Sequence, residues 1–387
     1  MADGTKYSKK GGWQPKLAAG LWCVGGTGTD NWRLGRTSEE VVPVVDRMHI
    51  LKSAGMEGYS GHIGADYEFD LDNSRAPNYV ESVFNQGERL GLVCVDVVGS
   101  EFKTERVRDG SFTSEDPEVR DYAINNATRA ARLARMKGIN VVRLWFGSDG
   151  KNGPFHRSNY DSIQRIEDGL LAVYDAQPEI QLSIEGKPGE PMGFQVIGGT
   201  GNAIAMCVRL NEMVGKEKDV TGRFIDPAFV IGPELNHMVM NGEDPEEGVA
   251  QAIAYGVMGD IHACDGLFRV ARDFDDQVGK YNPAMIFETL ARMHEGYEKG
   301  IYDSEWIILD QNTSKLPQGR QQIQHLMLSG DFIYAALDKA KSKTWMGRIE
   351  ELQKDGDYAS LDRLVMGLTG RVLVDAANRH PVGGHKV

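Results

Sequence analysis

Eight short β-rich runs alternate with longer segments of helical period along almost the whole chain of 387 residues. The runs lie at 17–26, 56–63, 92–99, 139–147, 180–188, 227–237, 259–266 and 305–312. Two of the helical segments begin with Asp-Pro-Glu, at Asp116 and Asp244, where the aspartate suits an N-cap and the proline suits the first helical position. Eight consecutive βα units predict an α/β chain folded as a parallel (β/α)8 TIM barrel.

A doubly wound open sheet is the alternative for such a pattern. That fold usually has a glycine-rich phosphate turn after its first strand. The segment VGGTGTD at 24–30 is rich in glycine but lacks the G-x-G-x-x-G spacing, so we prefer the barrel. The residues after 342 are charged and partly helical in pattern, with no obvious strand. We therefore expect a barrel domain over 1–342 and a C-terminal helical extension over 343–387.

Composition limits the partners of the chain. A formal net charge of −13 repels phosphate backbones and anionic lipids, so we expect neither nucleic acid nor a membrane as a partner. The N-terminal residues show no apolar core of a signal peptide. We interpret the widely spaced Cys23, Cys94, Cys207 and Cys264, which form no C-x-x-C pair, as small buried apolar side chains of a cytoplasmic protein.

Metal-capable side chains fall at the ends of the last four predicted strands. In a (β/α)8 barrel the carboxyl ends of the strands carry the chemistry. The metal-capable side chains, in chain order, are Glu185, Glu234 with His237, His262 with Asp265, and Asp310. Lys187 and Asn312 stand two residues after Glu185 and Asp310. Carboxylates crowded around one point repel one another unless a cation lies among them. Oxygen ligands with one or two imidazoles and no thiolate favour Mg²⁺, Mn²⁺ or Co²⁺.

Other residues extend this rim. Asp273 and Asp275, in the segment DFDD after the seventh run, have a spacing that suits a clamp for a second cation. Lys187 stands two residues after Glu185 on an extended strand and should face the same way. An ammonium at that place would stabilise negative charge on a carbonyl oxygen. The alternative is that Lys187 only pairs with Glu185.

These residues lie in motifs that resemble those of xylose isomerases, over about residues 17–340. The matching segments are GLWCVGGTGTDNW, RDGSFTSEDPEVRDYA, IEGKPGEP, GPELNHMVMNG, DFDDQVG and IILDQN. The resemblance implies a metal-dependent aldose–ketose isomerase that acts by a hydride shift. One cation would be held by Glu185, Glu234 and Asp310, and a second by Glu234, His237, Asp273 and Asp275.

The resemblance also implies roles for the remaining rim residues. Lys187 would bind the carbonyl oxygen of the sugar, and His62 would assist ring opening. Trp22 and Trp145 would wall the pocket. Trp32 would reach a neighbouring subunit's site, in a homodimer or homotetramer.

Departures from the motifs leave alternatives open. Ungapped spacing from Glu234 places His262 at the ligand position of the seventh strand, whereas a shift of three residues would place Asp265 there. An imidazole ligand would increase the preference for Mn²⁺ or Co²⁺. The aspartate expected to pair with His62 is not at its usual spacing, because Ala65 is there and Asp66 follows.

The substrate side also differs from the motifs. Asn312 replaces a Lys-like substrate-binding position, and the rim after the fourth strand reads WFGSDG. A sugar epimerase, or a lyase on an oxidised sugar, with Glu185 or Glu234 as base therefore stays open. Two further alternatives are an endonuclease-type barrel, which the acidic charge disfavours, and a sugar-binding barrel without turnover.

Overall fold

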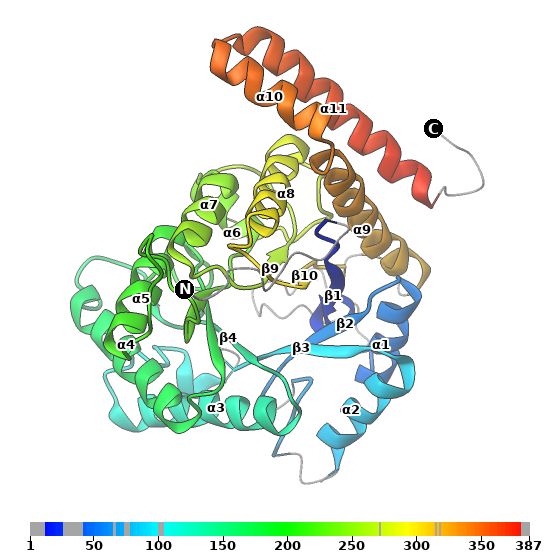
Figure 1. Ribbon diagram of the computed structural model, residues 1–387. Coiled ribbons are helices and arrows are strands. Elements are labelled where there is room, and N and C mark those ends of the chain that lie inside the picture. Colours follow the sequence, from blue (N-terminus) through cyan, green and yellow to red (C-terminus); the bar gives the residue numbers. More distant parts are fainter. Residues whose placement is uncertain are drawn as a thin grey trace.

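The computed structural model describes residues 12–25, 42–64, 67–72, 78–99, 104–270, 272–313, 316 and 319–380. Within them, eight parallel strands form one sheet that curls into a barrel (Figure 1). The strands are β1 (Lys16–Gly20), β2 (Gly58–His62), β3 (Val93–Val98), β4 (Val141–Trp145), β6 (Gln181–Glu185), β8 (Phe229–Ile231), β9 (Ile261–Ala263) and β10 (Trp306–Leu309). Parallel bridges from Ile231 to Met258 and from Glu234 to His262 join the two edge strands, β8 and β9. The predicted (β/α)8 barrel is confirmed.

Helices surround the barrel and follow the predicted alternation with the strands. They are α1 (Val44–Ser53), α2 (Tyr79–Leu90), α3 (Pro117–Met136), α4 (Asn159–Ala176), α5 (Thr200–Met213), α6 (Leu235–Asn241), α7 (Pro245–Tyr255), α8 (Pro283–Glu298) and α9 (Arg320–Ala340). The predicted caps are present, since Asp116 accepts from the Glu118 N–H at 2.9 Å and Asp244 from the Glu246 N–H at 3.1 Å. A short antiparallel pair, β5 (Gly150–Lys151) with β7 (Phe194–Gln195), lies outside the barrel sheet. No helix in the described ranges is long and apolar enough to cross a bilayer.

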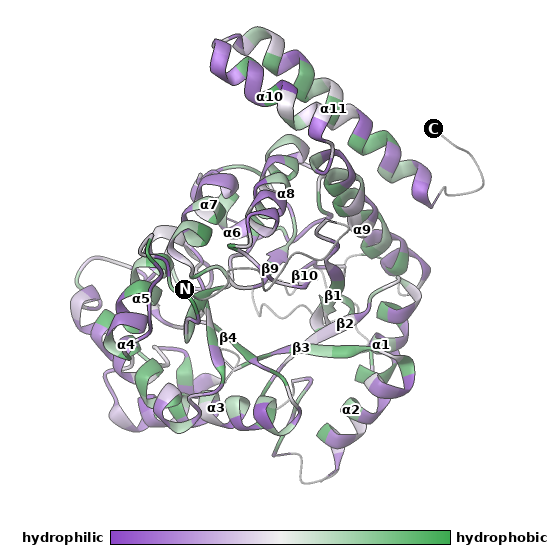
Figure 2. Ribbon diagram, viewed as in Figure 1, coloured by the Kyte–Doolittle hydropathy of each residue, from purple (hydrophilic) through white to green (hydrophobic). Residues whose placement is uncertain are grey.

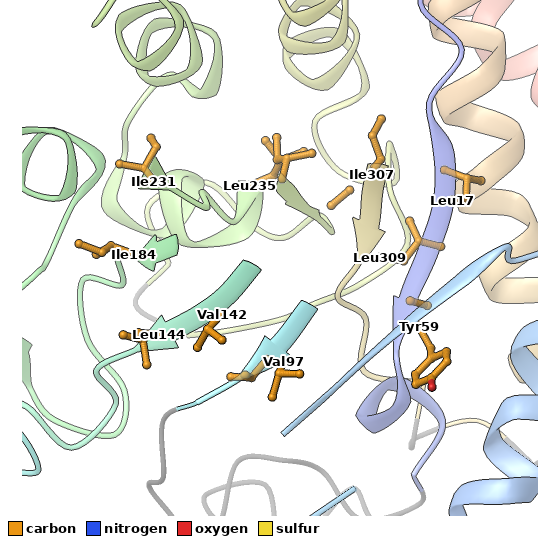
Figure 3. Close-up of a cluster of buried hydrophobic side chains, with 14 of the residues drawn as sticks. Leu17, Tyr59, Val97, Val142, Leu144, Ile184, Ile231, Leu235, Ile307 and Leu309 are labelled. Carbon is orange, nitrogen blue, oxygen red and sulfur yellow. The ribbon is translucent and has the colours of Figure 1, made fainter. Parts of the chain in front are cut away.

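The main core is the layer between the strands and the helices. Figure 2 shows hydrophobic and hydrophilic residues alternating along these helices. Figure 3 shows the buried strand side chains of this layer, among them Leu17, Val142, Ile184 and Leu309. Successive side chains along a strand point to opposite faces of the sheet. The strand residues next to these core residues therefore point into the barrel.

The barrel interior changes from apolar to polar toward the site. A small apolar cluster of Ala18, Val95 and Ile308 lies inside the barrel. The fully buried Ser60, Asp96, Arg143 and Ser183 also point inward. These four residues form a polar floor beneath the carboxyl ends of the strands.

The residues after 342 form two helices, α10 (Lys343–Asp355) and α11 (Tyr358–Arg379). Figure 1 shows them as a pair beside α9, with α10 projecting away from the barrel. Leu368, Val372 and Ala376 of α11 are buried in the main core. The C-terminal helical extension expected from the sequence is therefore present.

Several predicted strands are shorter than expected. β1 ends at Gly20, and Trp22 lies in the 3₁₀ helix η1 (Leu21–Val24). The run 227–237 contributes only β8, because Pro233 has no N–H to continue the sheet. Glu234 instead precedes α6, and His237 lies on that helix.

The N-cap of α3 gives a test of this local structure. Asp116→Ala should lower the free energy of unfolding by about 1 kcal/mol, because the Glu118 N–H loses its acceptor. Asp121→Ala, one turn further into α3 and exposed, is the matched control and should have a smaller effect. Urea denaturation of both variants would measure the difference, and equal losses would contradict the capping role.

Candidate active site

A cavity of about 40 Å³ lies at the carboxyl ends of the strands. Its walls contain Trp22, His62, Val98, Arg143, Trp145, Glu185, Lys187, Glu234, His237, His262, Asp273, Asp275 and Asp310. The structure thus brings together all the residues that the sequence singled out except Asn312, Trp32 and the alternative ligand Asp265. Asn312 does not line the cavity, and its backbone N–H donates to the Asp275 carbonyl at 2.7 Å. Trp32 lies outside the described residues.

Glu234 is the centre of the arrangement. Three groups of metal-capable atoms, each within 4.8 Å of one another, all contain this residue. They are Glu185–Glu234–His237, Glu234–His262–Asp310 and Glu234–Cys264–Asp275. The bridge between the Glu234 and His262 backbones brings the third residue after β8 and the middle of β9 side by side.

The protonation of the site reflects its crowded negative charge. Burial raises the pKa of Glu234, and the charges of Asp275 and Asp273 raise it further. Burial would also raise the pKa of Glu185, but the positive charges of His262 and His237 outweigh it and lower that pKa. The pKa of His262 is raised to about 9, chiefly by the charge of Glu185, so the raised pKa values of Glu234 and His262 both favour a proton beside the remaining carboxylates. A divalent cation could replace those protons.

The two histidines provide a second indication that a cation fits. Both ring nitrogens of His237 and of His262 are buried and lack a well-directed hydrogen bond in the described structure. Carboxylate oxygens nevertheless surround them: His262 Nδ1 lies 3.0 Å from Asp310 Oδ2 and 3.1 Å from Glu185 Oε2. Buried carboxylates and imidazoles gathered in this way are a suitable donor set for a divalent cation.

His262 and Asp265 face different surroundings. The Asp265 carboxylate accepts from the N–H groups of Tyr281 at 2.7 Å and Asn282 at 3.0 Å, and from Asn282 Nδ2 at 2.7 Å. Asp265 thus holds the loop before α8 and does not line the cavity. His262, in the middle of β9, faces Glu185 and Asp310. This geometry favours the register that makes His262 the ligand.

Lys187 is buried and forms an ion pair with Asp273. Its ammonium donates to Asp273 Oδ2 at 2.7 Å and lies 4.8 Å from the centre of the Trp145 ring. The ion pair is thus made with the loop after β9. Asn236 Nδ2 donates to the other oxygen of Asp273, so both carboxylate oxygens have partners.

The orienting acid of His62 is a residue that sequence reasoning missed. His62 Nδ1 lies 3.3 Å from Glu68 Oε2, and the backbone N–H of His62 donates to the same oxygen at 3.0 Å. Arg47 Nη1 donates to Glu68 Oε1 at 2.8 Å. Ala65 and Asp66, between the two partners, lie outside the described residues.

Arg143 is the second residue that sequence reasoning missed. Its Nη1 lies 3.3 Å from Glu185 Oε2, and its Nε lies 3.1 Å from Asp96 Oδ2. A signal existed in the sequence, because an arginine two residues before Trp145 must point the same way as that residue. In the rebuilt rim WFGSDG, Asp149 is buried and accepts from the Ser111 and Thr113 N–H groups at 2.9 and 2.8 Å.

The contrast between His262 and Asp265 can be tested by metal titration. We expect His262→Ala to weaken Mn²⁺ binding by about tenfold or more, because an inner donor is lost. Asp265→Asn should leave the affinity nearly unchanged, since that side chain bonds backbone groups outside the cavity. Calorimetry on both variants, with circular dichroism to verify folding, would measure this. Loss of binding only in Asp265→Asn would reverse the assignment.

Comparison with known proteins supports the fold. No known family profile matches the chain. Solved structures that resemble it include an L-ribulose 3-epimerase (TM-score 0.57, 13% identity, covering 86% of this chain and 97% of that one). An AP endonuclease of family 2 from Brucella melitensis also matches, with a TM-score of 0.54 and 15% identity, covering 81% of this chain and 97% of that one. A xylose isomerase domain protein from Alicyclobacillus acidocaldarius matches with a TM-score of 0.54 and 13% identity, covering 84% of this chain and 99% of that one. The chain therefore has the fold of the xylose isomerase-like TIM barrel proteins.

Proposed function

We propose that this protein is a metal-dependent sugar isomerase that interconverts an aldose and a ketose. The observation that carries the proposal is the shared cavity, in which the Lys187 ammonium faces a donor set for divalent cations. The same cavity has two tryptophans and a carboxylate-oriented histidine in its walls. These are the parts that ring opening and hydrogen transfer on a sugar require.

The cation sites follow from the three groups around Glu234. Glu185, Glu234, His262 and Asp310 would hold one divalent cation, and Glu234, His237, Asp273 and Asp275 are the sequence-based set for a second. Mg²⁺, Mn²⁺ and Co²⁺ suit these donors. Such a cation acts as a Lewis acid on hydroxyl and carbonyl oxygens of the substrate.

The side chains of the chain perform the remaining tasks. Glu68, fixed by Arg47, holds His62 so that its other ring nitrogen can exchange a proton with the ring oxygen of the sugar. Trp22 and Trp145 form apolar walls against the C–H faces of the sugar and exclude water. The Trp22 N–H donates to Asp310 Oδ1 at 2.6 Å, which fixes the ring on one side.

Lys187 would assist the hydrogen transfer itself. Asp273 and the Trp145 ring hold its ammonium, which would donate a hydrogen bond to the carbonyl oxygen. Negative charge develops on that oxygen as hydrogen moves, with its electron pair, from the neighbouring carbon to the carbonyl carbon. The hydroxyl proton of the donor carbon ends on the former carbonyl oxygen, so atoms and charge balance.

A sugar epimerase or a lyase on an oxidised sugar is the second candidate. The raised pKa of Glu234 favours it, because a carboxylate of that kind is a stronger base toward a proton next to a carbonyl. One structure with the same fold is named as an L-ribulose 3-epimerase.

We also propose a cytoplasmic homodimer or homotetramer that binds a small sugar and neither nucleic acid nor a membrane. The four cysteines are free, which suits a reducing compartment. Trp32 would contribute to the pocket of a neighbouring subunit.

Solvent deuterium would distinguish the two candidate reactions. A panel of aldoses and ketoses with Mn²⁺ in D₂O, followed by NMR, should give product with almost no deuterium at the receiving carbon. Direct transfer explains this result, because the moving hydrogen never reaches solvent. Stoichiometric deuterium would favour the glutamate base, and no metal-dependent turnover on any sugar would leave only a binding protein.

The role of Lys187 predicts a separation of turnover from metal binding. Lys187→Met should lower kcat by about 10²- to 10³-fold, because the developing oxyanion loses its donor. Mn²⁺ affinity should change far less, since the ammonium is not a ligand. Lys280→Met is the matched control, because Lys280 pairs with Asp276 of the same loop at 2.6 Å and does not line the cavity. Equal kcat in the two variants would refute the assignment.

A further inference from the structure

Cys264 lies against the central carboxylate of the site. It directly follows β9, on the same face of the strand as His262, and is fully buried. Its thiol donates to Glu234 Oε1 at 3.3 Å. The interpretation of this residue as a small apolar side chain therefore misses its surroundings, which are acidic.

The separation of the donor atoms suits a shared cation. Cys264 Sγ, a Glu234 oxygen and an Asp275 oxygen lie within 4.8 Å of one another. Sulfur and oxygen ligands of one tetrahedral cation lie about 3.6 Å apart, from metal–sulfur and metal–oxygen lengths of about 2.3 and 2.1 Å. Small side-chain movements would therefore bring all three atoms to one ion.

A buried imidazole points to the same place. His237 is 4% exposed, and neither of its ring nitrogens has a well-directed hydrogen bond in the described structure. Its Nε2 lies 3.2 Å from Glu234 Oε1, the oxygen that accepts from Cys264. The thiol and the imidazole thus meet the same Glu234 oxygen, and Asp275 lies beside the thiol.

The aspartate expected as a ligand here has other partners. Asp273 Oδ2 accepts from Lys187 at 2.7 Å, and Asp273 Oδ1 accepts from Asn236 Nδ2. Its backbone N–H also donates to Glu190 Oε2 at 3.0 Å. Asp273 Oδ2 also lies 3.5 Å from His237 Nε2, but its shorter contact is to Lys187, whereas Cys264 contacts Glu234 itself.

We propose that Cys264 is a ligand at the second cation position, together with Glu234, His237 and Asp275. The mixed sulfur, nitrogen and oxygen set selects a thiophilic cation such as Zn²⁺, Co²⁺ or Cd²⁺ over Mg²⁺. The thiol proton leaves to solvent on binding, because the thiolate is the ligand. This inference rests on the proposed function, because it requires a cation beside Glu234.

Cobalt spectroscopy on the full chain tests the ligand directly. Co²⁺ added to metal-free protein under reducing conditions should give visible ligand-field bands and a near-ultraviolet thiolate-to-cobalt charge-transfer band. Cys264→Ser should lose the charge-transfer band and keep visible bands from the remaining donors. Its Cd²⁺ affinity should fall by about tenfold or more, with little change for Mg²⁺.

Cys23→Ser is the matched control. The Cys23 thiol is also buried but donates to the Leu309 carbonyl at 3.3 Å, so this variant should keep both sets of bands. If Cys264→Ser does not fold, ¹¹³Cd NMR of the unaltered protein decides, since sulfur ligation shifts the signal strongly from that of an all-oxygen and nitrogen site.

The outcomes separate this inference from the proposed function. Visible cobalt bands without a charge-transfer band in the unaltered protein would overturn the Cys264 ligand and leave the other cation site intact. Persistence of the charge-transfer band in Cys264→Ser would also overturn it. No binding of Co²⁺, Mn²⁺ or Mg²⁺ at all would overturn the metal-dependent function as well.

Discussion

The buried guanidinium of Arg143 is the interaction on which the barrel interior and the site both depend. It pairs with Asp96 of β3 and Glu185 of β6, and donates to the carbonyls of Gly232 at 2.7 Å and Asp260 at 3.0 Å. Gly232 permits this approach, because a Cβ there would lie 2.1 Å from Nη1. One side chain thus ties β4 to four other segments of the barrel. Removing one partner would leave a buried charge uncompensated, at a cost of about 3–5 kcal/mol.

Charge balance connects this floor to the cavity above it. Arg143 compensates Asp96 and part of the charge of Glu185, while Lys187 compensates Asp273. Among the described residues, no lysine or arginine pairs with Glu234, whose ion-pair partner is the His237 imidazole at 3.2 Å. Burial and the negative charges of Asp275 and Asp273 raise the pKa of Glu234, so this carboxyl group marks the most crowded part of the site. The proposed divalent cation would therefore offset the charge of the whole arrangement and not of one residue.

The features that could be predicted from the sequence are those that local rules and the symmetry of the barrel control. The periodicity of apolar residues and the capping residues predict the strands, the helices and the Asp116 cap. The common orientation of parallel strands predicts that acidic residues at their carboxyl ends, such as Glu185, lie close together. Contacts across loops or through the barrel were not predictable in this way. The pairing of His62 with Glu68 depends on how the loop after β2 folds back. A cysteine in an apolar run also looks the same whether it faces the core or, as Cys264 does, a carboxylate.

The different contacts of Asp273 and Glu234 affect which type of reaction the site would favour. Asp273 orients Lys187, whereas Glu234 meets the Cys264 thiol and the His237 imidazole at one oxygen. A carboxylate that ligates cations is a weaker base than one that holds only a proton, because the cation's charge favours the ionised form. With both cation positions occupied, Glu234 would therefore be a poor base, and transfer of hydrogen within the substrate would be favoured. With one position empty, Glu234 could accept a proton. Occupancy of the position beside Cys264 would thus help to decide between isomerase and epimerase chemistry on the same scaffold.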